Sequence, residues 1–351
     1  MSKDKETLVI LTPGFPKDEN DSTCLPFQQL LVKDIKSCYP HLNIIVLSFQ
    51  YPYHKNKYTW NGIPVIPFAG RNKGGLFKRL LRRQITETLK EINQSHSIKG
   101  LLSFFCDECA FVGKEFADKS GIRHYCWIMG QDAKKENKYP ARCKFQPSEL
   151  IALSNFLQEE FEKNHGVRPA HVIPPGIEPG QFKLNSTARD IGILAVGSLI
   201  PLKQYDQFLY VISEIKKQIP SIKAVLIGDG PERQKLQNRI TSLGLDSNLE
   251  LKGEQPHTSV LESMRRSKLF LHTSAYEGFG VVCLEALAAG CHVIGFRKVM
   301  NNPIENWEIA KDKEEMIQKA VDFLKDRKTT YKQVAPFTMH NAVKKIAELF
   351  S

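Results

Sequence analysis

The sequence predicts an α/β protein built from two doubly wound domains, each around a mostly parallel sheet. Short apolar runs alternate with segments of helical periodicity along the chain, which is typical of βαβ units. The 351 residues are enough for two such domains, each with its own core. A connection with three prolines and two glycines, at residues 173–180, separates two halves that repeat this pattern.

In the first half, apolar runs mark the expected strands and amphipathic segments mark the helices between them. We expect strands at residues 8–12, 43–49, 65–68, 101–106, 124–129 and 150–154, with helices at 24–37 and 76–93. Because helices separate several of the strands, those strands should be parallel, with helices covering the faces of the sheet.

The second half repeats this arrangement. We expect strands at residues 191–197, 224–228, 249–251, 269–273 and 293–296, and helices at 205–218, 232–243 and 257–265, with one more helix from Gly280 to a stop at Gly290. The stretch 296–309 is irregular. A last helix, at about 335–350, carries Val343, Ile346 and Phe350 and needs an apolar surface to bury them.

These patterns predict the domain boundaries. We expect a first domain at residues 1–180, a second at 181–334, and a C-terminal helix at 335–351. The pattern leaves open whether this helix packs on the second domain or crosses back to the first.

Composition limits the class of protein. Hydrophobic residues make up 42% and charged residues 25%, as in ordinary globular domains. No apolar stretch is long enough to span a bilayer, the N-terminus lacks the pattern of a secretory signal, and the eight cysteines form no disulfide framework. We therefore expect a reduced, cytoplasmic protein without a metal site. The pair Cys106 and Cys109 has no second cysteine pair to complete a zinc site.

The formal net charge of +11 implies an anionic partner, such as a nucleotide-linked substrate, an acidic membrane surface or nucleic acid. The charge is densest at residues 71–83, which hold six basic residues and no acidic one. As a helix, this segment would place Leu76, Leu80 and Phe77 on one side. The other side would carry mostly Lys78, Arg79, Arg82 and Arg83. Such a helix is either membrane-interfacial or an ordinary surface helix with a solvated basic face.

Glycine loops follow several expected strands. They contain Gly14 after the first strand, Gly197 and Ser198 after the first strand of the second half, and Gly228 after the next. A glycine in such a loop lets the backbone approach a ligand closely, although ordinary turns use it too. Lys203 follows Ser198 closely and could hold a phosphate as a point charge.

The most informative segment lies at residues 274–290. A strand is followed by Glu277, then by Gly278 and Gly280, and then by a mostly apolar helix that contains Glu285. A glycine turn at the N-terminus of a helix suits a phosphate. A carboxylate inside an apolar helix is costly without partners, and ligand hydroxyls would be suitable ones. The segment therefore predicts a ligand that is both phosphate and sugar.

This segment resembles the family 4 retaining glycosyltransferases of the GT-B fold. Their fingerprint is two glutamates separated by seven residues, with Gly-Phe-Gly after the first, matched here by Glu277 through Gly280 and by Glu285. The loops at residues 196–203, 228–231 and 251–253, and the connection at 172–177, resemble further motifs of the family. The resemblance covers most of the chain and implies the GT-B fold, in which two Rossmann-like domains face each other across a cleft.

The resemblance also implies roles for individual residues. Glu277, Lys203 and Asp132 would be catalytic, and Glu285 would bind the ribose hydroxyls. The implied donor-binding residues are Gly14, Gly197, Ser198, Lys203, Gly228, Lys252, Gly253, Glu277, Gly278, Phe279, Gly280, Val281 and Glu285. No metal or other cofactor would be needed, because Lys203 and a helix N-terminus would stabilise the departing diphosphate. Front-face attack would then retain the anomeric configuration without a protein nucleophile.

Two positions depart from the family. Ser198 stands where the family often has Arg, and Met129 stands where many members have the His of a His-Gly-x-Asp motif that ends here in Asp132. The implied function is transfer of a sugar from a UDP- or GDP-linked donor to a glycan or lipid-linked acceptor, in bacterial cell-envelope polysaccharide synthesis. We expect a cytoplasmic protein, with peripheral binding to the inner face of the membrane as one option. The alternatives are a GT-B protein that binds nucleotide sugar with little turnover and a basic nucleic-acid-binding protein. The second lacks any recognition motif.

Overall fold

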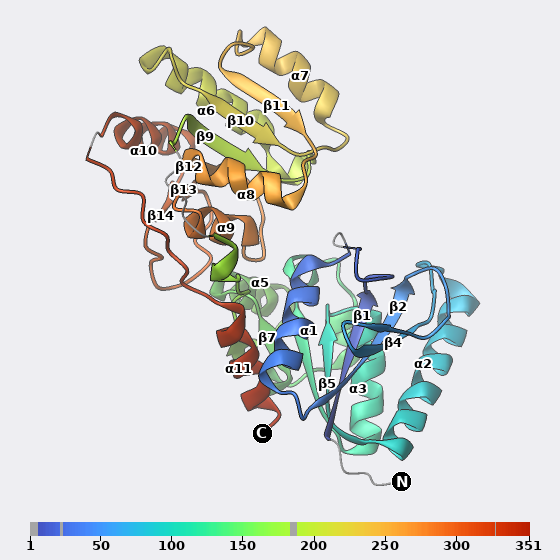
Figure 1. Ribbon diagram of the computed structural model, residues 1–351. Helices are drawn as coiled ribbons and strands as arrows, with labels where there is room; N and C mark the ends of the chain where they lie inside the picture. The colour runs from blue at the N-terminus through green and yellow to red at the C-terminus, as the bar shows by residue number, and fades with distance from the viewer. Residues whose placement is uncertain (1–5, 22–23, 183–187, 327) are drawn as a thin grey trace. The chain divides into compact units, whose positions relative to one another are not determined.

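The computed structural model describes residues 6–21, 24–182, 188–326 and 328–351 (Figure 1). It divides into two compact units. Unit 1 comprises residues 1–176 together with 339–351, and unit 2 comprises residues 177–338. The polypeptide therefore passes from unit 1 to unit 2 at Gly176 and returns at Met339. The C-terminal helix belongs to the N-terminal unit.

Unit 1 is built around an eight-stranded sheet, counted over the described residues. Its strands are β1 (Glu6–Gly14), β2 (Asn43–Tyr51), β3 (Tyr58–Trp60), β4 (Ile63–Pro67), β5 (Ser97–Phe104), β6 (Arg123–Ile128), β7 (Leu150–Ala152) and β8 (His171–Val172). They lie in the order β3-β4-β2-β1-β5-β6-β7-β8, and every pair is parallel except the β3–β4 hairpin. From β1 the chain adds β2, β4 and β3 on one side, and from β5 it adds β6, β7 and β8 on the other. The switch point of this sheet therefore lies between β1 and β5.

Helices cover both faces of this sheet. They are α1 (Pro26–Cys38), α2 (Gly75–Ser95), α3 (Glu108–Ser120), α4 (Tyr139–Cys143), α5 (Asn155–His165) and α11 (Met339–Leu349). The apolar stripe of α2, which includes Leu81, Ile85 and Leu89, packs with α3 against Val9 and Leu11 of β1. Helices α1 and α11 lie side by side in unit 1 (Figure 1). The return of α11 buries the apolar residues that the sequence left without a surface.

Unit 2 is built around a six-stranded parallel sheet, again counted over the described residues. Its strands are β9 (Ile191–Val196), β10 (Ala224–Ile227), β11 (Leu249–Gly253), β12 (Ser267–His272), β13 (His292–Gly295) and β14 (Trp307–Ile309). The order β11-β10-β9-β12-β13-β14 is the 3-2-1-4-5-6 order of dinucleotide-binding folds. Its switch point lies between β9 and β12, where a ligand is expected at the carboxyl ends of the strands.

The helices of unit 2 are α6 (Tyr205–Gln218), α7 (Arg233–Ser242), α8 (His257–Arg265), α9 (Val281–Ala288) and α10 (Lys313–Lys325). Helices α6, α7 and α10 share one apolar core with residues of β9, β12 and β13, which includes Phe208, Leu236 and Met316. Helix α9 is buried along most of its length, and Gly290 follows it in a left-handed conformation at φ 82°. That conformation ends the helix where the sequence predicted a stop.

Most expected elements are present, and the structure adds the helices α3, α4, α5 and α10 and three short strands. The short strands β3, β8 and β14 were not expected, because runs of two or three residues carry too little periodicity to be recognised. Strand β14 lies inside the stretch 296–309, which reads as irregular in the sequence. The units divide at 176/177 and 338/339, a few residues from the expected boundaries at 180/181 and 334/335. Among the described residues, no helix combines the length and the apolar character needed to cross a membrane.

Glycines at the carboxyl ends of β9, β10 and β11 allow the strand ends to approach closely. The Gly228 amide donates to the Gly253 carbonyl at 2.9 Å, and the Gly197 amide donates to the Ile227 carbonyl at 3.0 Å. A Cβ on Gly228 would fall 2.0 Å from the Gly197 carbonyl oxygen, and Gly228 has φ 148°. Glycine is therefore required at residue 228 by packing alone, whatever a ligand adds.

We expect Gly228→Ala to lower the free energy of unfolding by about 2 kcal/mol or more, because neither the φ value nor the Gly197 carbonyl leaves room for a Cβ. Urea unfolding of the full chain measures this. Gly180→Ala is the matched control in unit 2, since its Cβ would meet no atom within 4 Å, and it should change the free energy by about 0.5 kcal/mol or less. Equal midpoints for the two variants would contradict the packing argument.

Candidate functional site

The candidate site in unit 2 lies at the switch point of its sheet, where two loops are tied together. The short turn Pro201–Lys203 follows β9, and the loop at residues 273–280 follows β12. The Thr273 hydroxyl donates to the Lys203 carbonyl at 2.9 Å, and the Ala275 amide donates to the Leu202 carbonyl at 3.0 Å. These two hydrogen bonds fix Lys203 beside the loop that carries Glu277.

Glu277 is the centre of a small polar cluster. The Lys203 ammonium lies 2.6 Å from Glu277 Oε2, and His272 Nε2 lies 3.6 Å from the same oxygen. Ser274 Oγ is 3.2 Å from His272 Nε2. Burial alone would raise the pKa of Glu277, but the neighbouring His272 and the charge and hydrogen bond of Lys203 lower it to about 2. The carboxylate is therefore ionised at neutral pH and already paired with a cation.

Gly280 begins helix α9 and shapes the turn after Glu277. Its φ of 86° is left-handed, and a Cβ there would meet Glu277 Cγ at 3.4 Å and His272 Cε1 at 3.6 Å. The Phe279 side chain points away from this turn, since it is buried and packs edge-on against Trp307 and Phe337. Phe279 is thus a core residue, and only its backbone is placed to serve the site. Gly278 precedes Phe279 in the loop, and Val281 is the first residue of α9.

Glu285 lies in the second turn of α9 from Gly280, with its side chain about one-fifth exposed. His257 Nε2 at the start of α8 lies 2.9 Å from Glu285 Oε1. The hydrogen bond with Glu285 raises the pKa of His257, although burial opposes this. The carboxylate that the sequence left without a protein partner therefore has one, and it remains accessible to a ligand.

The remaining unit 2 residues of the predicted site line the same edge of the sheet. Gly197 follows β9, Gly228 follows β10, and Gly253 ends β11, while Ser198 is exposed beside Gly197. The Lys252 carbonyl accepts from Gln255 Nε2 at 3.1 Å, and the Lys252 ammonium lies 3.7 Å from Glu250 Oε2. The carbonyl oxygen of Lys252 is thus already used by the protein.

Gly14 and Asp132 belong to unit 1. Gly14 ends β1 at a register shift, next to the switch point of that sheet. Asp132 is buried, and its Oδ2 accepts from the Met129 amide at 2.7 Å and from the Cys106 amide at 2.9 Å. Burial raises the pKa of Asp132 to about 7 despite these two hydrogen bonds. The contacts of this carboxylate are with the backbone of its own unit, at the ends of β5 and β6.

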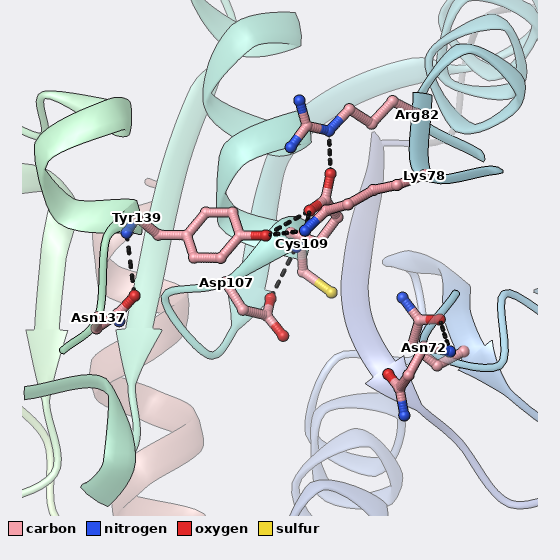
Figure 2. A network of polar contacts seen from close by, with 9 residues as sticks. Asn72, Lys78, Arg82, Asp107, Cys109, Asn137 and Tyr139 are labelled. Carbon is pink, nitrogen blue, oxygen red and sulfur yellow. Dashed lines mark hydrogen bonds and ion pairs between the residues drawn. The ribbon is translucent and has the colours of Figure 1, made fainter. Parts of the chain in front are cut away.

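The four basic residues that the sequence places mostly on one side of α2 do not share one environment. Lys78 and Arg82 turn toward Glu108, a buried carboxylate at the start of α3, and the Lys78 ammonium lies 2.7 Å from Glu108 Oε2. Figure 2 shows both side chains reaching from α2 toward Tyr139, whose hydroxyl donates to Glu108 at 2.5 Å. Burial would raise the pKa of Glu108, but its three hydrogen bonds lower it. Only Arg79 and Arg83 of the four are exposed.

Residues 177–335 match the family model of the glycosyl transferases group 1, a region that corresponds closely to unit 2. We call unit 2 the group 1 domain, after the family model that it matches. The group 1 domain accordingly contains the Lys203–Glu277 pair, the Glu285–His257 pair and the three strand-end glycines.

The curated relatives match little more than half of the chain, at low identity. The gpi3 component of the phosphatidylinositol N-acetylglucosaminyltransferase of Schizosaccharomyces pombe is 27% identical over 202 residues, covering 56% of this chain and 44% of that protein. A glycosyltransferase of Methanocaldococcus jannaschii is 28% identical over 214 residues, covering 59% of this chain and 58% of that protein. The chain spans less than half the length of the first curated relatives that it matches.

Solved structures define the fold. Anabaena HepE in complex with UDP superposes with a TM-score of 0.72 at 19% identity, over 98% of both chains. The lipopolysaccharide outer core galactosyltransferase WaaB, in its apo form, gives a TM-score of 0.72 at 14% identity over 98% of both chains. The chain has the GT-B fold of two Rossmann-like units, as the sequence predicted.

Three residues near the predicted site are absent from the expectations drawn from the sequence. His272 and Ser274 adjoin Glu277, and His257 adjoins Glu285. His272 and Ser274 stand at the carboxyl end of an apolar strand, which is where ligand-binding side chains gather in parallel sheets. That signal was available for His272 and Ser274. His257 required the contact between α8 and α9, which no local pattern reveals.

One group of side chains in the described residues could hold a metal ion. The ligand atoms of Asp34, Cys38 and His340 lie within 4.8 Å of one another, where α1 meets α11. This group belongs to unit 1, whereas the Glu277 cluster belongs to the group 1 domain. A thiol, an imidazole and a carboxylate would suit Zn²⁺ better than Mg²⁺.

The low pKa of Glu277 leads to a pH prediction. Its carboxylate has a pKa of about 2 in the folded protein against an ordinary value of 4.5, so ionised Glu277 stabilises the folded protein above about pH 4.5. This stabilisation is lost as the pH falls toward about 2. Between about pH 5 and about pH 3, we expect the free energy of unfolding to decrease by about 2 kcal/mol less in Glu277→Gln than in the wild-type protein. Urea unfolding at each pH measures this.

The control for this measurement is Glu314→Gln, at an exposed position of α10. It should keep the pH profile of the wild-type protein. A Glu277→Gln profile as steep as the wild-type one would show that Glu277 is not held by Lys203 and His272 as described.

Proposed function

We propose that this protein is a family 4 retaining glycosyltransferase that moves a sugar from a nucleotide-diphosphate donor to an acceptor. The observation that carries the proposal is the pair of carboxylates around Gly280. Glu277 is held beside the Lys203 ammonium and Glu285 beside His257, both at the switch point of the group 1 domain. A cation next to the start of a helix suits a diphosphate, and a partly exposed carboxylate farther along that helix suits ribose hydroxyls.

In the proposed reaction, negative charge develops on the diphosphate as the bond to the sugar breaks. The Lys203 ammonium would neutralise that charge, together with the backbone at the start of α9. The low pKa of Glu277 keeps the carboxylate unprotonated, so it could accept hydrogen bonds from sugar hydroxyls while it orients Lys203. The acceptor proton would leave with the departing phosphate, so no protein nucleophile is needed.

The donor is proposed to be UDP- or GDP-linked, with Gly14, Gly197, Ser198, Gly228, Lys252 and Gly253 contributing to its binding. The acceptor is proposed to be a glycan or lipid-linked molecule of bacterial cell-envelope polysaccharide synthesis, handled in the cytoplasm or at the inner face of the membrane. The structural likeness to a lipopolysaccharide galactosyltransferase supports the proposed acceptor. The likeness to HepE, whose structure holds UDP, supports the proposed donor.

Donor binding without transfer is the second candidate. It is favoured by Met129, which is buried and non-titratable at the position where the family often has a histidine. The two candidates differ in one measurement, the appearance of glycosylated product under conditions where the donor is bound.

Calorimetric titration with a panel of UDP- and GDP-sugars tests the proposal. We expect at least one donor to bind, and we expect Lys203→Ala and Glu285→Ala each to weaken that binding by about ten- to a hundredfold. These changes correspond to the loss of a charge-assisted contact with the diphosphate and with the ribose. Lys311→Ala and Glu314→Ala are matched controls on exposed positions of the same unit.

The controls should leave donor affinity unchanged. A protein that binds no member of the panel, or that binds equally well without Lys203 and Glu285, would not be the proposed transferase.

Transfer should proceed without a divalent cation, because Lys203 and α9 take the place that a metal ion holds in other transferases. With donor and acceptor supplied, we expect a chelator to change the rate by less than about twofold. The product should keep the anomeric configuration of the donor, as seen by proton NMR. A loss of activity that added Mg²⁺ restores would contradict metal independence, and an inverted product would contradict retention.

A further inference from the structure

Four large hydrophobic side chains are exposed in the described part of the chain, and they gather in one region of unit 1. Tyr53 is 60% exposed, Leu76 70%, Phe77 62% and Leu80 49%. Tyr53 follows β2, and the other three lie in the first two turns of α2. Two cations join the segments. The Arg71 guanidinium lies 5.4 Å from the Tyr53 ring centre and donates to the Tyr53 carbonyl, and the Lys73 ammonium lies 4.8 Å from the Phe77 ring centre.

The fold does not need these apolar side chains. Helix α2 packs on its unit through a separate stripe that includes Leu81, Ile85 and Leu89. Leu76 and Leu80 lie one turn apart on the opposite, solvent-facing side. An exposed leucine or phenylalanine is common singly, whereas a group of this kind marks a surface that meets something else.

The charge around the group is of one sign. Exposed Arg71, Lys73, Arg79 and Arg83 surround the apolar side chains, and within the described residues none of the four has a carboxylate within 4.0 Å. From residue 35 to residue 86 the sequence contains nine Lys and Arg residues and no Asp or Glu. Lys78 and Arg82 are not counted in this group, because both side chains turn toward the buried Glu108 carboxylate, whose single negative charge offsets one of their two positive charges (Figure 2). We call the four apolar and four basic residues the α2 patch.

We propose that the α2 patch docks unit 1 on the surface of an anionic lipid bilayer. Leu76, Phe77 and Leu80 would enter the boundary between headgroups and acyl chains, and the four cations would meet the lipid phosphates. A soluble polyanion would account for the cations but would leave the apolar side chains in water. A protein interface would bury charge among apolar residues, which such interfaces avoid at their centres. A bilayer accounts for both features at once.

The α2 patch lies at the edge of the unit 1 sheet where the parallel strands end. Tyr53 follows the carboxyl end of β2, and α2 begins after the carboxyl end of β4. These strands are parallel to β1, whose carboxyl end carries Gly14. The patch therefore lies on the same edge of the sheet as the switch point of unit 1. A bilayer bound there would present an amphiphilic acceptor to that edge, which extends the proposed function, although the docking itself does not depend on it.

Vesicle binding without any donor tests the proposal. We expect the wild-type protein to co-sediment with vesicles of phosphatidylcholine and phosphatidylglycerol and not with phosphatidylcholine alone. The variant Arg79→Ser/Arg83→Ser should lower the partition coefficient by about tenfold or more. The variant Leu76→Ser/Phe77→Ser/Leu80→Ser should lower it by a similar factor while keeping the charge. All five positions are exposed, so the fold should tolerate both changes.

The charge-matched control is Lys344→Ser/Lys345→Ser, which removes two exposed cations from α11 of the same unit. It should change the partition coefficient by less than about twofold. A direct reporter is Phe77→Trp, because the native Trp60 and Trp127 are fully buried and Trp307 is only 8% exposed. Lipids brominated on their acyl chains should quench the new indole in anionic vesicles.

Several outcomes would overturn the proposal. These are the absence of vesicle binding, equal binding to neutral vesicles, an equal loss in the α11 control, or an apolar triple variant that binds like the wild-type protein. The last two would leave only a general attraction of a basic protein to anions. Calorimetry of donor binding on the same variants separates the two proposals, since patch variants should bind the donor normally and donor-site variants should bind vesicles normally.

Discussion

The order of strands in each parallel sheet is the constraint on which the candidate site depends. In unit 2, β9 and β12 are neighbours although they are far apart in the chain, and the loops after them leave the same edge. Two hydrogen bonds between these loops then hold Lys203 against Glu277. The close approach of strand ends at Gly197 and Gly228 depends on the same order. A different neighbour for β9 would separate the cation from the carboxylate.

Buried carboxylates are stabilised in two ways in this protein. Glu277 and Glu108 are each paired with cations, which lower the pKa and keep the charge. Asp132 is stabilised by two backbone amides, and burial raises its pKa toward neutrality. At the partly exposed Lys203–Glu277 pair, the Lys203 ammonium could also bind a ligand phosphate, because an ion pair at such a site can exchange partners. The arrangement at Asp132 fixes a loop and has no cation to share. Glu277 therefore has a paired cation beside it, whereas Asp132 has none.

The two units differ in how much their sequence reveals about function. The group 1 domain matches a family model and carries its polar residues on short loops after apolar strands. Unit 1 has the same type of sheet, yet its distinguishing features are the α2 patch and the Glu108 network, which fit no general motif. The polar residues of unit 2 lie on short loops that can be recognised locally, whereas the features of unit 1 depend on contacts between separate elements.

The sequence by itself determined the fold class and most of the strands and helices, and it pointed to the segment from Glu277 to Glu285 as the centre of the candidate site. Apolar periodicity and glycine loops are local signals, so they can be read without knowing which strands are neighbours. Only the tertiary structure decided that Lys203 pairs with Glu277, that His257 pairs with Glu285, and that the C-terminal helix returns to unit 1. It also divided the basic residues of α2, because Glu108 lies on another helix and attracts Lys78 and Arg82 while Arg79 and Arg83 stay in solvent. Such pairs join residues that are distant in the chain. Because the attraction between two charges depends on their distance in space, no local pattern of the sequence reveals which residues will pair.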